Sequence, residues 1–95
     1  MNDHGEVEEL RRRIDEVDAA IVEAVNTRLA LVQELWQVKA RIGVDRVDPG
    51  RERRLREALA AVNRGPLTPE GLDELIGSLL ALVKRELGRA GGGAP

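Results

Sequence analysis

The sequence predicts an all-α fold, in which one long helix and two shorter ones form a single small domain. From Leu10 to Ile42 the apolar residues recur at alternating steps of four and three, the spacing of helices that pack lengthwise against other helices. No proline or glycine interrupts residues 6–42. Two later segments each begin with a capping residue followed by proline, which is typical of helix starts.

The first helix is expected from about Glu6 to Ile42, with Gly43 as its C-terminal stop. About 37 residues at ~1.5 Å each form a rod roughly 55 Å long, whereas a domain of this size has a radius of gyration of only ~13 Å. Its apolar seam therefore needs a partner, and oligomerisation is expected. The seam consists of Leu10, Ile14, Val17, Ile21, Ala24, Leu31, Leu35, Val38 and Ile42, with position 28 completing the pattern.

The two shorter helices follow a short connection over residues 44–47. Asp48-Pro49 predicts an N-cap and first helical residue, and this second helix is expected to reach about Asn63 before Arg64-Gly65-Pro66. Thr68-Pro69 repeats the signal, and the third helix is expected to reach about Leu87. The inward residues are expected to be Leu55, Leu59 and Val62 of the second helix and Leu72, Leu75, Ile76, Leu79, Leu80 and Val83 of the third.

Composition excludes several functional classes. The net charge of -2, from 15 basic and 17 acidic residues, gives no support for nucleic-acid or acidic-membrane binding. There is no cysteine for a disulfide or thiolate metal site, and His4 is expected to be exposed rather than catalytic. Without a signal-like segment or an apolar run near ~20 residues, a cytoplasmic protein is expected. Residues 1–5 and 89–95 are expected to be flexible ends around a helical domain over 6–88.

Arg28 stands in the apolar seam, where an unpaired guanidinium would be costly to bury. An anion must face it, either a carboxylate of a partner helix or a ligand. Lys39 lies three helical turns further on, within ~20° of the direction of Arg28 and roughly 16 Å away, a gap suited to a small dianion. Arg11 projects near 100° from Arg28 and roughly 25 Å away, so it would serve the equivalent pocket of an antiparallel partner.

The start of the second helix adds Arg51 and Glu52. A helix N-terminus with an arginine favours a carboxylate ligand, and the short loop is expected to bring this turn near Lys39. Glu52 is suited to accept a hydrogen bond from a ligand hydroxyl. Its alternative role is a surface pair with Arg56, worth only ~0.3 kcal/mol.

These residues resemble the all-helical class of chorismate mutases over about residues 7–87. The resemblance is carried by the positions Leu10-Arg11, Ile14-Asp15, Asp18, Ile21, Arg28, Lys39, Asp48, Arg51-Glu52 and Leu55. It implies an intertwined antiparallel homodimer with two active sites, and the rearrangement of chorismate to prephenate without a metal or cofactor. By position, Arg28 and a partner's Arg11 would hold the two carboxylates, and Lys39 would donate to the ether oxygen. Arg51 would support the carboxylate end, and Glu52 with the backbone of Asp48 would accept from the hydroxyl.

The third helix departs from the family pattern. The family has two polar residues at the positions that here correspond to Val83 and Leu87, and the second contacts the ether oxygen. If Leu87 faces the pocket, Lys39 acts there alone, and one such contact is worth ~3 kcal/mol. We therefore expect a weak enzyme in isolation, or one whose C-terminus rearranges to bring in Arg85 or Arg89.

Three alternatives stay open. Some family members are activated by the first shikimate-pathway enzyme, 3-deoxy-arabino-heptulosonate-7-phosphate synthase, and Leu87-Gly88-Arg89 is loosely similar to their C-termini. Isochorismate-pyruvate lyases and 4-amino-4-deoxychorismate mutases use similar cations on the same fold. A non-enzymatic helical dimer would explain the seam, but not four charged residues at family spacing.

Trp36, the single aromatic residue, is expected to pack against the second or third helix, or else to form a wall of the pocket or of a partner surface.

Overall fold

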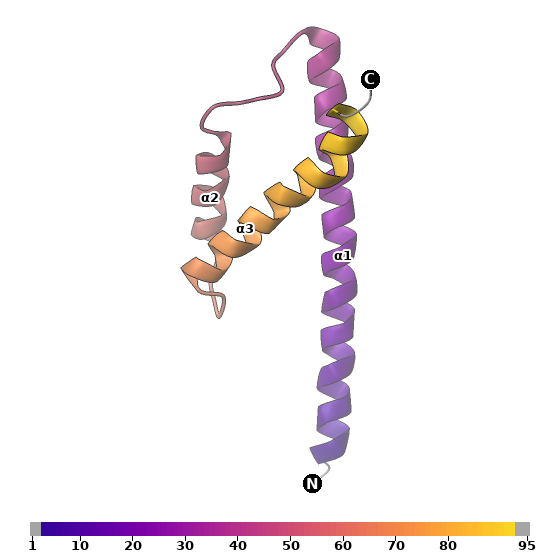
Figure 1. Cartoon of the computed structure of the whole chain (residues 1–95). Coiled ribbons are helices and arrows are strands. Elements are labelled where there is room, and N and C mark those ends of the chain that lie inside the picture. Colours follow the sequence, from indigo (N-terminus) through magenta and orange to yellow (C-terminus); the bar gives the residue numbers. More distant parts are fainter. Residues whose placement is uncertain (1–2, 93–95) are drawn as a thin grey trace. The chain divides into compact units, whose positions relative to one another are not determined.

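A computed structural model describes residues 3–92, with side chains up to residue 88. It contains the helices α1 (Asp3–Ile42), α2 (Arg51–Val62) and α3 (Pro69–Val83), followed by the π-helical segment η1 (Lys84–Gly92) (Figure 1). No strand occurs within this range, so the all-α prediction is confirmed. Residues 1–2 and 93–95, which belong to the ends expected to be flexible, lie outside the described residues.

The chain divides into two compact units, Met1–Leu31 and Val32–Pro95. The first contains most of α1, in which no residue is buried. Its apolar seam is open to solvent, with Ile14 and Ile21 exposed to 56% and 54%. His4 is exposed, as expected. The helix begins three residues earlier than the predicted Glu6.

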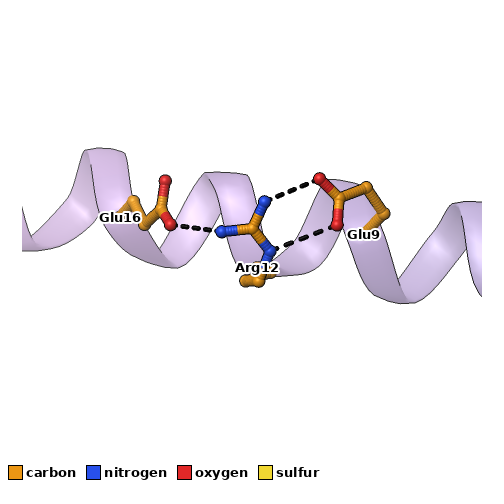
Figure 2. Close-up of polar contacts among 3 residues, drawn as sticks. All are labelled: Glu9, Arg12 and Glu16. Atoms are coloured by element: carbon orange, nitrogen blue, oxygen red, sulfur yellow. Dashed lines mark hydrogen bonds and ion pairs between the residues drawn. The ribbon is translucent and has the colours of Figure 1, made fainter.

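Charged side chains support the first turns of α1 from its polar face. Arg12 donates from Nε and Nη2 to the carboxylate of Glu9, three residues before it, and from Nη1 to Glu16, four residues after it (Figure 2). The hydrogen bond to Glu9 raises the pKa of Arg12, with a smaller contribution from Glu16. These spacings place the three side chains on one helix face. The charged groups of this face therefore have partners within the chain, whereas the apolar seam stays exposed.

Gly43 ends α1 as predicted. Its φ of 77° lies in the left-handed region, which glycine adopts without a Cβ clash. The amide of Gly43 donates to the carbonyl of Ala40 at 3.4 Å, and that of Val44 donates to the carbonyl of Lys39 at 2.8 Å. This pair of bonds is a Schellman motif, which satisfies the last carbonyls of the helix and fixes the direction in which the loop leaves Lys39.

The start of α2 differs from the prediction. Asp48 is not the N-cap: Gly50, with φ 84°, takes that position, and the helix begins at Arg51. The carbonyl of Asp48 instead accepts from the amide of Arg51 at 3.1 Å. Residues 48–51 therefore form a turn of their own before the helix, which the left-handed conformation of Gly50 permits.

The core of the second unit comes from α3, which supplies its buried residues Leu72, Ile76 and Val83. Thr68 caps this helix as predicted, accepting from the amide of Gly71 at 3.0 Å. Arg56 joins α2 to α3 through the carboxylate of Asp73 at 3.2 Å.

Three expectations about these helices are wrong. The α-helix ends at Val83 rather than Leu87, and the chain continues in the wider turns of η1. Leu75 and Val62 were expected to point inward, but they are 48% and 66% exposed.

Candidate active site

Arg28 lies on the seam of the first unit. Its side chain is half-buried, and Nη1 is shielded from solvent without a hydrogen-bond partner among the described residues. It borders a shallow depression of about 470 Å³ on its helix, lined also by Ala20, Glu23, Ala24, Thr27 and Leu31. A shielded guanidinium nitrogen without an acceptor is unfavourable, and residues 3–88 supply no acceptor for it.

Arg11 belongs to the same unit and has a different environment. Its side chain is 70% exposed, and Nη1 lies 3.3 Å from Oε1 of Glu8 in a surface ion pair. Such pairs are weak in water, so Glu8 holds Arg11 only loosely. The guanidinium is thus available to a ligand outside its own chain.

Lys39 lies near the C-terminal end of α1, in the second unit. Its ammonium donates to the backbone carbonyl of Arg46 at 3.3 Å. The guanidinium of Arg46 in turn lies over the ring of Trp36, with Cζ 4.0 Å from the ring centroid, a cation–π distance. One loop residue thus contacts two side chains of the last turns of α1.

The residues around the start of α2 occupy separate environments. Asp48 makes an ion pair with Arg54 at 3.0 Å. Arg51 is exposed at the first helical position and makes no ion pair with any residue from 3 to 88. The alternative role of Glu52, a surface ion pair with Arg56, is present: Oε1 of Glu52 lies 3.8 Å from Nη2 of Arg56, a long distance for such a pair.

Glu52 also borders a pocket of about 410 Å³ in the second unit. Its other lining residues are Trp36, Gly77, Leu80, Ala81, Val83 and Lys84. Most of this wall is apolar, with one carboxylate and one ammonium as its charged groups. A pocket of this size and composition suits a small ligand with polar groups.

Val83 and Leu87, the two apolar residues near the end of the third predicted helix, border different pockets. Val83 borders the Glu52 pocket. Leu87 lies in η1 and borders a smaller pocket of about 170 Å³, together with Trp36, Arg46, Gln33, Gln37 and Ala40. Of the sequence-predicted site residues, Glu52 and Val83 share a pocket.

Lys84 is the residue that sequence reasoning missed. It borders the pocket directly after Val83, whereas Arg85 pairs with Glu86 at 3.7 Å and does not border it. The sequence contains a signal for this placement, since Lys84 stands four residues after the apolar Leu80 and hence on the same helix face.

No three His, Cys, Asp or Glu residues gather as a metal site among residues 3–92, and no helix in that range is long and apolar enough to cross a membrane.

Comparison with known proteins adds one match. Residues 10–86 match the model of the family described as chorismate mutase type II. The matched range covers α1 from Leu10, all of α2 and α3 and the first residues of η1, and it includes every candidate site residue except Leu87. No curated protein matches the chain.

Proposed function

The chain belongs to the type II chorismate mutase family, and from that premise we propose that it rearranges chorismate to prephenate. In this reaction the ether C–O bond breaks and a C–C bond forms within one molecule. No proton, electron or group is transferred. The catalyst therefore has to hold a flexible dianion in a compact conformer and place positive charge where the breaking bond gathers negative charge.

The observation that carries the proposal is the state of Arg28. Its Nη1 is shielded and has no acceptor among the described residues. A guanidinium presents a planar fork of donors that matches a carboxylate in a bidentate way. We propose that a substrate carboxylate satisfies this fork, and that Arg11 of the partner subunit binds the second carboxylate.

The remaining roles follow from the charge of each group. Lys39 carries a compact ammonium, which suits a single ether oxygen, and it donates the transition-state hydrogen bond. Arg51 supports the carboxylate end at the N-terminus of α2. Glu52 accepts from the substrate hydroxyl with the backbone of Asp48, and the 410 Å³ pocket that it borders supports this role.

A homodimer is part of the proposal, because Arg11 acts across subunits. The seam of α1 supports it, since five of its large apolar side chains in the first unit are more than two-fifths exposed: Leu10, Ile14, Val17, Ile21 and Leu31. Fully burying such a side chain stabilises by roughly 1.5–3 kcal/mol. A second α1 in antiparallel orientation would cover this seam and place Arg11 toward the other subunit's site.

Turnover by the purified chain tests the function. We expect prephenate from chorismate, and loss of about 100-fold or more in kcat/KM for Arg28→Gln, because the guanidinium fork makes two charge-assisted hydrogen bonds to the carboxylate, each worth roughly 1.5–3 kcal/mol. Arg13→Gln is the matched control, since Arg13 is an exposed arginine of the same helix without an ion pair among residues 3–88. A dimer that converts neither chorismate nor the related substrates isochorismate and 4-amino-4-deoxychorismate would instead indicate a non-enzymatic helical dimer.

Parallel incubations separate the related activities. Isochorismate would give salicylate and pyruvate in a lyase, and 4-amino-4-deoxychorismate would give the amino analogue of prephenate in that mutase. We expect chorismate to be converted fastest. A faster reaction with either of the other two substrates would assign the chain to that branch.

We further propose that the isolated enzyme is slow and that a partner enzyme raises its rate. The support is local: Val83 presents an apolar side chain to the Glu52 pocket, and Leu87 borders a different pocket. Assays with and without 3-deoxy-arabino-heptulosonate-7-phosphate synthase test this idea. Equal, fast turnover in both would contradict it.

A further inference from the structure

Arg46 holds the loop between α1 and α2 on the last turns of α1 through two contacts. Its guanidinium lies over the ring of Trp36 at 4.0 Å, and its backbone carbonyl accepts from Nζ of Lys39 at 3.3 Å. Trp36 and Lys39 are three residues apart, so they share one face of the helix. The two contacts therefore fix the side chain and the backbone of Arg46 on that face together.

Other contacts restrict the same loop. The amide of Val44 donates to the carbonyl of Lys39 at 2.8 Å, and the amide of Val47 donates to the carboxylate of Asp45 at 3.1 Å. Leu87 borders the pocket formed beside Trp36 and Arg46, which adds an apolar wall next to the stacked pair. The carbonyl of Arg46 is thus one acceptor at a defined place rather than part of a free loop.

We propose that Trp36 and Arg46 are positioning residues for Lys39. An ammonium has three hydrogens on a flexible four-carbon stem. The carbonyl of Arg46 takes one of them and fixes the rotation of the group, which directs the other two hydrogens toward the ligand. This inference rests on the proposed role of Lys39 at the ether oxygen. Arg46 does not line the Glu52 pocket, whereas Trp36 also borders it, so the principal test is made at Arg46.

The positioning is expected to affect kcat more than KM. A lysine that is already oriented loses less conformational freedom when the transition state forms. Without the stack, the loop carbonyl leaves Lys39, and the ammonium samples rotamers that do not point at the ether oxygen. The two carboxylates are held by other groups, so substrate binding changes little.

Arg46→Met is the principal variant, because it keeps the stem and removes the cation from an exposed loop. We expect kcat to fall about 10- to 100-fold, with KM changed by less than about twofold and an unchanged melting temperature. Trp36→Phe keeps an aromatic face and should retain most of kcat, whereas Trp36→Leu should lose it. Arg53→Met removes an exposed cation of α2 without an ion pair among residues 3–88 and is the matched control.

A measurement independent of turnover follows from the composition. The chain has two lysines, Lys39 and Lys84, and one tryptophan. A brief pulse of an amine-acylating reagent, quantified by mass spectrometry, gives the labelling of Lys39 relative to Lys84. We expect this ratio to rise severalfold in Arg46→Met because the hydrogen bond to the carbonyl is lost, and the fluorescence of Trp36 to change in the same variant.

The outcomes are distinct for the two proposals. An unchanged labelling ratio, or an unchanged kcat in Arg46→Met, overturns the positioning role. A melting temperature that falls while kcat and the ratio stay constant also overturns it, because the pair would then only anchor the loop. Failure of the wild-type chain to convert chorismate contradicts the proposed function instead, whatever the labelling ratio shows.

Discussion

The carboxylate of Asp48 lies 3.0 Å from Nη2 of Arg54, so the loop before α2 is tied to the first turn of that helix. Gly50 lies between them in the left-handed conformation, with φ 84°, which glycine adopts without a Cβ clash. The side chain of Asp48 is occupied within the chain by this ion pair. Its backbone, which the family resemblance assigns to the substrate hydroxyl, is unaffected by the identity of the side chain.

Asp48→Asn therefore tests whether the substrate is contacted by the backbone of Asp48 or by its carboxylate. Both partners of the ion pair are about half-exposed, so its loss should cost less than ~1 kcal/mol after screening by solvent. We expect kcat/KM to stay within about threefold of wild type, measured by chorismate consumption, and Arg54→Gln to behave alike. A hundredfold loss confined to Asp48→Asn would show that the carboxylate itself meets the ligand.

Lys84 is expected to bind a negatively charged part of the ligand, because it borders the pocket that contains Glu52. Lys84→Gln should raise KM about tenfold, the effect of losing one charge-assisted contact at a partly exposed site. Arg85→Gln is the control, since it removes the same charge from the neighbouring residue, which is paired with Glu86. Equal effects of both variants would mean that only the net charge of the helix end matters.

The seam of α1 is expected to mediate dimerisation. Ile14→Asp places a carboxylate in the centre of the seam and should give monomers at concentrations where wild type is dimeric, measured by analytical ultracentrifugation. Ala19→Asp introduces the same side chain at an exposed position on the opposite face of the helix and should leave the dimer intact. Loss of the dimer in both variants would argue for a general charge effect rather than a specific seam.

Arg11 and Arg28 are expected to act on one substrate from different subunits. Arg11→Ala and Arg28→Ala should each be inactive. When the two variants are refolded together, half of the dimers are mixed and each contains one intact site, so about a quarter of wild-type activity should return. Mixed dimers, verified by mass spectrometry, that regain no activity would place Arg11 in the site of its own chain.

Local periodicity was sufficient to predict α1. A seam with alternating steps of four and three, uninterrupted by glycine or proline and followed by Gly43, specifies a helix whatever surrounds it, because backbone hydrogen bonds and the left-handed stop are local. The seam position of Arg28 predicted a cation in need of an anion; in the structure its Nη1 is shielded and has no hydrogen-bond partner among the described residues. The family was likewise recognisable from the residue pattern alone.

Only the tertiary structure decided the start of α2, the end of α3 and the surroundings of Trp36. Asp48-Pro49 predicted the start of α2, but the N-cap is Gly50, the side chain of Asp48 pairs with Arg54, and its carbonyl accepts from the amide of Arg51. Arg46 lies over the ring of Trp36, and Glu52 pairs with Arg56. Lys84, next to Val83 in the chain, borders the same pocket as Val83 and Glu52. The pocket brings Trp36 and Glu52 together with Lys84, residues that lie far apart along the chain. Sequence spacing defines the face of one helix, but contacts between helices and loops depend on how the whole chain packs.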